Sequence, residues 1–324
     1  MRDDQRKKVL ITGASGLLGR AILKEFEVDG SWECMGLAFT RAKGNLRKVD
    51  LKDVGAVRAL VSEFRPTVII HSAAERRPDV VEQQLEASRQ LNVVVSQNLA
   101  SIAKEFNCFL LYISTNGVFD GKSPPYKPSD VPNPSNNYCI FKFEGEKATL
   151  QTLPKSSGVL RVPYLYGQVE NLAECSCTGK FTLSSSYLIP YFSSMASALF
   201  QAVLNNTKSK SVTDYGMRYP TLVDDIAIVI RQICEKALSE NDFRGIWHWS
   251  GSEALTKYQM TKIMAEVFNL DFSHIKPASE PPTGAKRSNN SQLDCSDLMK
   301  LNFGRHTPFR VGIQECLRNF VNVS

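Results

Sequence analysis

The chain has 324 residues, of which 43% are hydrophobic and 22% are charged. This length suits one large α/β domain, or one domain with a smaller lobe, and the composition is that of a globular protein. The formal net charge of +6 is modest and the basic residues are scattered, which argues against a nucleic-acid-binding face. Apolar runs too short to span a membrane and a charged start without a signal core predict a cytoplasmic protein, possible also in the nucleus.

The eight cysteines are spread along the chain, and no set of them has the spacing of a zinc site. Cys175 and Cys177 form an isolated C-x-C pair. In an intracellular protein, reduced thiols with a structural role are the default. We therefore expect neither a disulfide framework nor a metal.

The first predicted elements are a buried strand at 9–11, a turn with three glycines, and a helix with an apolar stripe. Gly13 would allow the sharp turn, Gly16 would let the backbone approach a pyrophosphate, and Gly19 would let the helix pack on the strand. Glycine clusters often mark only turns, but a strand before and a helix after favour a phosphate on the helix N-terminus. The predicted contacts are Gly13, Ser15, Gly16, Leu17 and Leu18.

The end of the second predicted strand, 32–39, decides between NAD and NADP. An acid there would accept hydrogen bonds from the 2′-OH of NAD, whereas a basic residue accommodates the 2′-phosphate of NADP. The chain has Phe39, Thr40 and Arg41 at this point and no acid. Arg41 can fork onto a phosphate and Thr40 can donate a hydroxyl. A solvated basic turn is the alternative, but the position after the glycine turn favours NADP bound by these three residues.

A short third strand is predicted at 49–51, followed by an amphipathic helix at 54–64. Asp50 could hold the adenine amino group, with Leu51 beside it at the cofactor.

The continuous apolar run at 68–71 predicts a fourth, buried strand. It is followed by small residues, beginning with Ser72, that would let a cofactor lie against the backbone. His71 is expected to be a packed residue at the strand end. Arg76 and Arg77 come next and could face a phosphate; a salt-bridge cluster within the loop is the alternative.

A long helix at 91–106 and a fifth strand at 109–113 complete the alternation of strands and helices. This alternation predicts a doubly wound parallel sheet, the Rossmann type of α/β fold. We expect an NADP-binding Rossmann domain at 1–166 and a smaller α/β lobe at 167–324. Part of 215–250 is expected to return to the Rossmann sheet.

The chemistry is concentrated after the fifth strand. Ser114 and Thr115 end that strand, and Tyr138 and Lys142 lie four residues apart on one face of the next predicted helix. A nearby ammonium would lower the phenol pKa, so that the tyrosine could pass a proton to a carbonyl held by a hydroxyl of Ser114 or Thr115. A surface Tyr–Lys pair is the alternative. The glycine turn earlier in the chain favours Thr115, Tyr138 and Lys142 as catalytic groups, with Tyr138 and Lys142 also contacting the cofactor.

Together these motifs resemble the extended short-chain dehydrogenases/reductases. Several strings are similar to the dTDP-4-dehydrorhamnose reductase branch of that family, and others to the regulatory β subunits of methionine adenosyltransferase. The resemblance covers about 9–317, and it implies a cofactor contact from Leu165. The strings of the first kind are 118–121, 160–161, 166–167 and 219–221, and those of the second kind are 73–82, 247–251 and 292–296.

The resemblance to the reductases breaks down beside the catalytic groups. The reductases carry Asp and Tyr where this chain has Asn116 and Gly117, and Gly and Thr within the stretch filled here by 139–141. Intact cofactor contacts beside altered substrate contacts favour a non-catalytic, NADP-binding regulatory subunit of S-adenosylmethionine synthetase. The implied partner is the catalytic subunit of that enzyme, without nucleic acid or membrane. The alternatives are an NADPH-dependent sugar-nucleotide reductase of the dTDP-4-dehydrorhamnose type, and an NADP-sensing scaffold with another partner.

The second half of the chain carries less chemistry. Stretches 171–194 and 205–211 are predicted as loops, and a helix from 221 is expected to have Asp224 or Asp225 as its cap. A further helix at 256–268 is expected to have Thr256 as its cap. The β subunits extend a C-terminal tail that contributes to partner contact, whereas this chain ends at Ser324, so contact through the folded body is expected.

Overall fold

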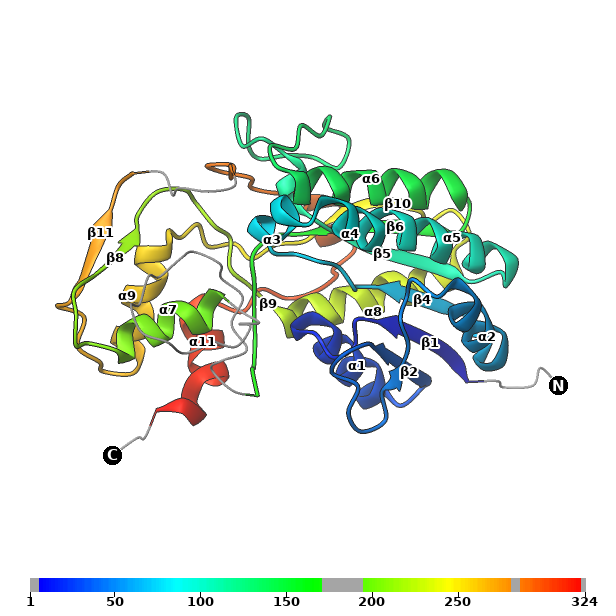
Figure 1. The fold of residues 1–324 in the computed structure, drawn as a ribbon, viewed down its shortest axis with the longest axis horizontal. Coiled ribbons are helices and arrows are strands. Elements are labelled where there is room, and N and C mark those ends of the chain that lie inside the picture. The colour runs from blue at the N-terminus through cyan, green and yellow to red at the C-terminus, as the bar shows by residue number, and fades with distance from the viewer. Residues whose placement is uncertain (1–5, 171–194, 281–285, 322–324) are drawn as a thin grey trace.

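The computed structural model describes residues 6–170, 195–280 and 286–321. Seven parallel strands form its central sheet in the order β10-β6-β5-β4-β1-β2-β3 (Figure 1). This arrangement confirms the predicted doubly wound fold. The strands are β1 (Lys7–Thr12), β2 (Trp32–Ala38), β3 (Arg47–Lys48), β4 (Val68–His71), β5 (Phe109–Thr115), β6 (Ser157–Val162) and β10 (Gly245–His248).

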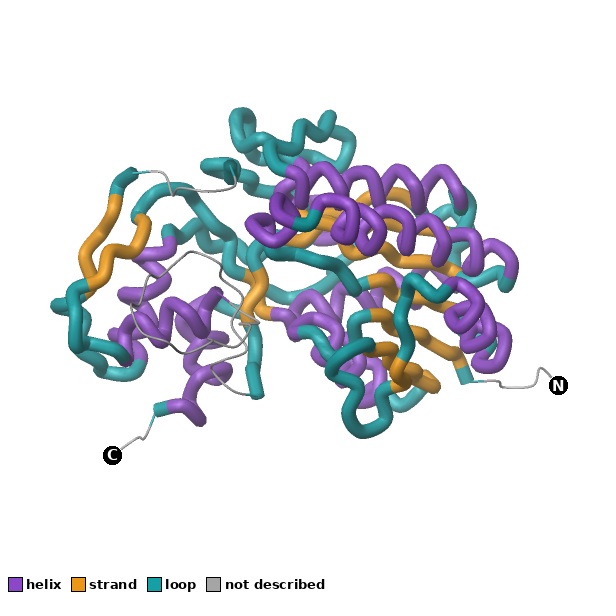
Figure 2. The backbone as a smooth tube through the Cα atoms, in the orientation of Figure 1, coloured by secondary structure: helices purple, strands orange, loops and turns teal. Residues whose placement is uncertain are grey.

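Helices cover both faces of this sheet (Figure 2). In β1, Val9 and Ile11 face the core beneath α1 and α8, while Leu10 faces the core beneath α2 and α5. Burial on both faces explains why the strands are continuous apolar runs without polar alternation. The helices of this part are α1 (Leu17–Asp29), α2 (Val54–Phe64), α3 (Pro78–Gln83), α4 (Leu85–Arg89), α5 (Val95–Glu105), α6 (Asn137–Thr152) and α8 (Val223–Ser239).

Two predicted elements of this part have different bounds in the structure. The third strand is Arg47–Lys48 rather than 49–51; pairing continues only as far as the backbone N–H of Val49, which donates to Ala38. The helix predicted at 91–106 begins earlier, because α4 runs directly into a π-helical turn, η1 (Gln90–Val94), and then into α5. π-turns of this kind occur frequently at functional sites.

The second lobe, on the left of Figure 1, packs around its own core of buried aliphatic and aromatic side chains. Its parallel strand pair β8–β11 shows that strand structure begins within the predicted loop 205–211. Its elements are α7 (Met195–Leu204), β8 (Lys210–Thr213), α9 (Lys257–Val267), β11 (Ile275–Ala278), α11 (Phe309–Leu317) and η4 (Arg318–Phe320), with β7 (Leu165–Tyr166) pairing β9 (Thr221–Leu222) at the junction. The short helix α10 (Ser296–Met299) instead packs on β10, and its Leu298 joins the core of the central sheet. The predicted loop 171–194 and the last residues, 322–324, lie outside the described residues.

Of the two predicted helix caps, the one at Thr256 is confirmed and the acidic cap of α8 is wrong. Thr256 caps α9 as expected, because its hydroxyl accepts the N–H of Gln259 at 3.1 Å and the side chain of Gln259 accepts the N–H of Thr256 at 2.8 Å. The predicted acidic cap of α8 is wrong, because Leu222 stands at the cap position without a side-chain bond. Asp225 instead lies buried in the first turn of α8, where it accepts a hydrogen bond from Arg305 Nε at 2.8 Å.

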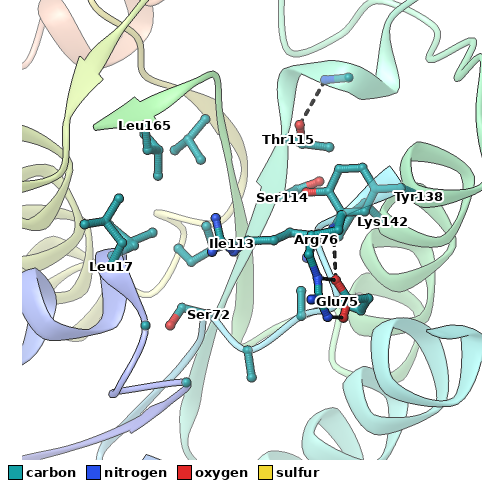
Figure 3. A pocket seen from close by; sticks show the side chains of 18 of the residues that line it. Leu17, Ser72, Glu75, Arg76, Ile113, Ser114, Thr115, Tyr138, Lys142 and Leu165 are labelled. Carbon is teal, nitrogen blue, oxygen red and sulfur yellow. Dashed lines mark hydrogen bonds and ion pairs between the residues drawn. The ribbon is translucent and has the colours of Figure 1, made fainter. Parts of the chain in front are cut away.

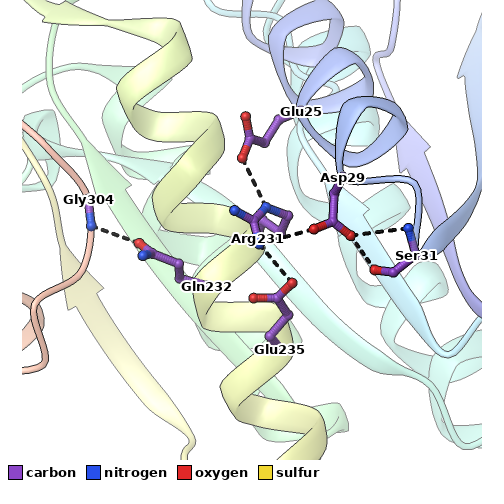
Figure 4. A network of polar contacts seen from close by, with 7 residues as sticks. All are labelled: Glu25, Asp29, Ser31, Arg231, Gln232, Glu235 and Gly304. Atoms are coloured by element: carbon purple, nitrogen blue, oxygen red, sulfur yellow. Dashed lines mark hydrogen bonds and ion pairs between the residues drawn. The ribbon is translucent and has the colours of Figure 1, made fainter.

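Side chains of α8 also bond to the neighbouring helix α1 and to the backbone at Gly304. Arg231 on α8 contacts Glu25 and Glu235 at 2.9 Å each and Asp29 at 3.6 Å, joining α8 to α1 (Figure 4). Gln232 accepts the backbone N–H of Gly304 at 2.7 Å. These contacts hold the C-terminal half of α1 against α8, and α8 against the segment at Gly304. None of the helices in the described ranges is long and apolar enough to cross a membrane.

Candidate functional site

A cavity of about 750 Å³ lies at the carboxyl ends of the strands, the usual place for a ligand in a doubly wound sheet. It runs from the glycine turn, past the ends of β4 and β5, to the second lobe (Figure 3). Every residue predicted to contact the cofactor or to act in catalysis lines it: Gly13, Ser15, Gly16, Leu17, Leu18, Phe39, Thr40, Arg41, Asp50, Leu51, Ser72, Arg76, Thr115, Tyr138, Lys142 and Leu165. Within the described residues, no group of His, Cys, Asp or Glu side chains could hold a metal ion.

The glycine turn has the geometry of a phosphate cradle. Gly13 has a φ of +70°, and a Cβ there would lie 2.9 Å from the backbone of Ala73. Gly16 is the N-cap of α1 without any side-chain bond, and the first turn of the helix carries no acid. The N-terminal N–H groups of α1 therefore lack a capping side chain at the cavity wall, which fits a bound phosphate.

The two arginines that follow β4 have different surroundings. Arg77 pairs with Glu75 through Nε–Oε1 at 2.8 Å and Nη2–Oε2 at 2.5 Å, which is the predicted salt-bridge cluster within the loop. The side chain of Arg76 instead lies within the cavity, between Tyr138 and Leu17 (Figure 3). Desolvation lowers the pKa of Arg76, the charges of Tyr138 and Glu75 oppose this, and the charge of Arg41 lowers it further. The guanidinium groups of Arg41 and Arg76 are therefore close enough for their charges to repel each other.

A buried hydrogen-bond chain supports this loop. Thr12 Oγ1 lies 2.8 Å from His71 Nδ1, and His71 Nε2 lies 3.1 Å from Ser96 Oγ. Asn92, in the π-helical turn, accepts the N–H of Glu75 at 2.9 Å and donates to its carbonyl at 2.8 Å. His71 is thus a packed residue, as predicted, and burial together with the charge of Lys142 lowers its pKa to about 3. Asn92 was missed from the sequence, because only the fold brings it to Glu75.

The predicted catalytic groups meet in the cavity, but their electrostatics differ from the prediction. Tyr138 bonds to the side chain of Thr115, which also accepts the N–H of Gly117 at 3.1 Å. Burial raises the pKa of Tyr138, with a further rise from Cys139, so the expected lowering of the phenol pKa by Lys142 is wrong. The ammonium of Lys142 lies 4.0 Å from the ring centre of Tyr112, and burial lowers its own pKa to about 7 against the opposing charge of Glu146.

Ser114, the other predicted hydroxyl, donates a hydrogen bond to the buried ion pair of Glu146 and Arg161. Its Oγ donates to Glu146 Oε1 at 2.5 Å, and Glu146 also accepts Arg161 Nε at 2.9 Å and Arg161 Nη2 at 2.7 Å. The side chains of Glu146 and Arg161 are each 1% exposed. Arg161 Nη1 also approaches His248 Nε2 at 3.4 Å. The sequence offered one signal for this network, a single arginine within an apolar strand.

The residues that differ from the reductase pattern fit one another. A Cβ at Gly117 would lie 2.5 Å from Cys139 Sγ, so a side chain at 117 would collide with the thiol. The side-chain amide of Asn116 donates to the carbonyl of Ser291, from the second lobe, at 3.1 Å. The second lobe closes this end of the cavity with Met217, Arg218, Tyr219, Lys257, Arg287, Ser288 and Ser291, none of which was predicted.

Comparison with known proteins gives one family and two kinds of relative. The RmlD substrate binding domain family matches residues 7–177 and 191–322. Methionine adenosyltransferase 2 subunit beta of Xenopus tropicalis is 46% identical over 97% of this chain and 88% of its own length, and the Bos taurus protein of that name is 45% identical with the same coverage. The dTDP-4-dehydrorhamnose reductase of Aggregatibacter actinomycetemcomitans is 29% identical over 90% of this chain and 92% of its own.

Solved structures support the same fold. The dTDP-4-dehydrorhamnose reductase of Bacillus anthracis in complex with NADP has a TM-score of 0.79 at 22% identity, covering 97% of this chain and 99% of its own. The UDP-glucose 4-epimerase of Thermotoga maritima with UDP-glucose has a TM-score of 0.78 at 16% identity, covering 97% and 98%. At these identities the likeness concerns the fold.

Proposed function

Since this chain belongs to the RmlD substrate binding domain family and is a homologue of methionine adenosyltransferase 2 subunit beta, we propose that it is a non-catalytic, NADP-binding regulatory subunit of S-adenosylmethionine synthetase. One observation carries the proposal most. The chain is about 45% identical to those β subunits over 97% of its length, against 29% for the reductase. The altered residues beside Tyr138 support the same conclusion.

The cavity supports NADP as the cofactor. The uncapped start of α1 and the cradle at Gly13 fit a pyrophosphate, and the cations of Arg41 and Arg76 fit the additional phosphate that distinguishes NADP from NAD. Asp50 and Leu51 line the end of the cavity assigned to adenine. Bound NADP supplies a redox-active nicotinamide, and in this proposal it serves as a structural or sensing ligand. We assign its binding chiefly to 1–166, with 167–324 as the smaller lobe that shares the pocket.

The proposed partner is the catalytic subunit of S-adenosylmethionine synthetase. A regulatory subunit acts by binding some states of its partner more tightly than others. The chain should therefore shift the partner's apparent affinity for methionine or product, or its stability, without activity of its own. Such coupling is typically about 1–3 kcal/mol, which corresponds to a shift of about 5- to 150-fold. The two subunits are expected to meet in the cytoplasm, with the nucleus as a second location.

A reductase is the second candidate, because Thr115, Tyr138 and Lys142 meet in one cavity. Two observations count against it. Burial raises the pKa of Tyr138, which makes the phenol a weaker acid toward a substrate carbonyl, and the thiol of Cys139 fills the space that a side chain at 117 would enter.

The test measures S-adenosylmethionine synthesis by the purified catalytic subunit with and without this chain. We expect the chain to change the apparent affinity of the catalytic subunit for methionine several-fold, or to shift its thermal unfolding temperature. We also expect this chain to oxidise little NADPH with dTDP-4-dehydrorhamnose. Unchanged synthesis together with robust NADPH oxidation, lost in Tyr138→Phe, would establish the reductase instead.

A further inference from the structure

Residues 286–292, which we call the strap, contribute Arg287, Ser288 and Ser291 to the lining of the cavity. Three elements of the first lobe hold the strap. The amide of Asn136, the N-cap of α6, donates to the carbonyl of Lys286 at 2.7 Å. Asp79, at the start of α3, lies 3.7 Å from Arg287 Nη2. The amide of Asn116, directly after β5, donates to the carbonyl of Ser291 at 3.1 Å.

The tether at Asn116 depends on an amide. The side chain must donate a proton, because its partner is a carbonyl oxygen, and a carboxylate has no proton to donate. An aspartate at 116 would instead place a negative charge against the carbonyl of Ser291. Ser291 is 4% exposed, so water cannot readily screen that contact.

The strap brings a cation to the cavity. Arg287 and Ser288 line the wall close to α6, and the charge of Arg287 is near enough to lower the pKa of the Cys139 thiol, after burial has raised that pKa and Asn136 has opposed the rise. Cys139 directly follows Tyr138. The strap therefore contributes positive charge to the cavity lining beside α6.

We propose that Asn116 is a positioning residue of the ligand site, whose amide holds the strap against the end of β5 and so keeps Arg287 in the lining of the cavity that takes the ligand. This inference rests on the proposed function, in which that ligand is NADP. It assigns a role to a position where the chain differs from the reductases. Asn116 acts through Arg287 and does not itself bind the ligand.

The test compares three variants of the full chain. Asn116→Asp removes the donor and adds a charge, and Asn116→Ala removes the donor alone. Asn290→Asp is the matched control: it lies in the same strap, and its Oδ1 accepts Tyr219 OH at 3.3 Å and the N–H of Gln292 at 3.1 Å, bonds that a carboxylate retains. Hydrogen exchange at 286–292 in the free protein, NADP⁺ titration calorimetry and thermal unfolding are measured for each.

We expect both Asn116 variants to speed exchange in the strap and to weaken NADP⁺ binding by about three- to tenfold, the range of one hydrogen bond. Asn290→Asp should stay within about twofold of wild type on the same scale. In an Arg287→Ala background, Asn116→Asp should have little further effect on NADP⁺ affinity, because the two residues act as a unit. A merely structural role would not produce this non-additivity.

Unchanged exchange and affinity in the Asn116 variants would overturn the inference. Equal weakening by Asn290→Asp would also overturn it, because a change in the strap that leaves the Asn116 bond intact would then have the same effect. Failure of the wild-type protein to bind NADP⁺ would refute the cofactor in the proposed function, and with it the role of Arg287. Normal wild-type binding with additive Asn116 and Arg287 effects would refute only the positioning role.

Discussion

The buried pair of Glu146 and Arg161, which bonds to Ser114 of the cavity lining, yields the sharpest prediction. Glu146→Gln keeps the shape of the side chain and removes its charge. The carboxylate accepts three short hydrogen bonds, at 2.5, 2.7 and 2.9 Å, and both partners are 1% exposed. The variant would therefore leave the guanidinium of Arg161 buried without its counter-charge.

The expected cost follows from this geometry. Three independent bonds to a charged group, at about 1.5–3 kcal/mol each, would sum to more than a typical buried pair is observed to contribute. Bonds that converge on one carboxylate are not additive, so we take the cost of breaking a buried pair, about 3–5 kcal/mol. Urea unfolding of wild type and variant, extrapolated to water, measures it.

The exposed pair Lys236–Glu240 supplies a control. Its Nζ–Oε1 distance is 2.6 Å, as short as the buried contacts, but Glu240 is 55% exposed. Glu240→Gln should cost less than about 1 kcal/mol. If Glu146→Gln cost no more than this control, burial would not determine the strength of the pair and the reasoning would fail.

Three further predictions concern the site and its supports. Arg41→Ala should abolish most of the preference for NADP⁺ over NAD⁺, a loss of about 1.5–3 kcal/mol, measured by titrating both nucleotides; equal wild-type affinities would contradict it. Gly117→Ala should lower thermal stability because its Cβ meets the thiol of Cys139, and adding Cys139→Ala, which removes the thiol and keeps a good helix former in α6, should restore it; a stable single variant would refute the fit. The pKa of His71 is about 3 in the folded protein and about 6.5 in the unfolded chain, so between these values the unfolded chain binds the extra proton. The free energy of unfolding should therefore fall by up to about 1.4 kcal/mol per pH unit as the pH drops from about 6.5 to about 3. His71→Gln should flatten this slope in acid unfolding curves, and an unchanged slope would exclude His71 as its cause.

Local patterns predicted much of the first lobe. The bounds of α2 and β4 match the predicted 54–64 and 68–71, because a periodic stripe and a buried apolar run are both local signals. The cap at Thr256 was also predictable, since the capping box spans only four residues. The failed cap of α8 shows the limit: Asp225 is held by Arg305, 80 residues later, and tertiary contact overrode its local preference.

In the site, too, the features that depend on local sequence were predictable and those that depend on distant residues were not. The glycine turn and the Tyr138–Lys142 spacing were visible as motifs, and these residues line one cavity. The wrong expectation for the Tyr138 phenol arose because the sequence does not reveal burial, which is the largest cause of its raised pKa. The strap could not be predicted, because its tether joins Asn116 to a residue 175 positions later.

Complex formation tests the central claim most directly. The purified chain and the purified catalytic subunit of S-adenosylmethionine synthetase are mixed and separated by size-exclusion chromatography, with and without NADP⁺. The proposal predicts co-elution, and where NADP⁺ strengthens the complex, linkage requires the catalytic subunit to tighten NADP⁺ binding by the same factor. Separate elution at micromolar concentration in both conditions would contradict the assignment as a regulatory subunit.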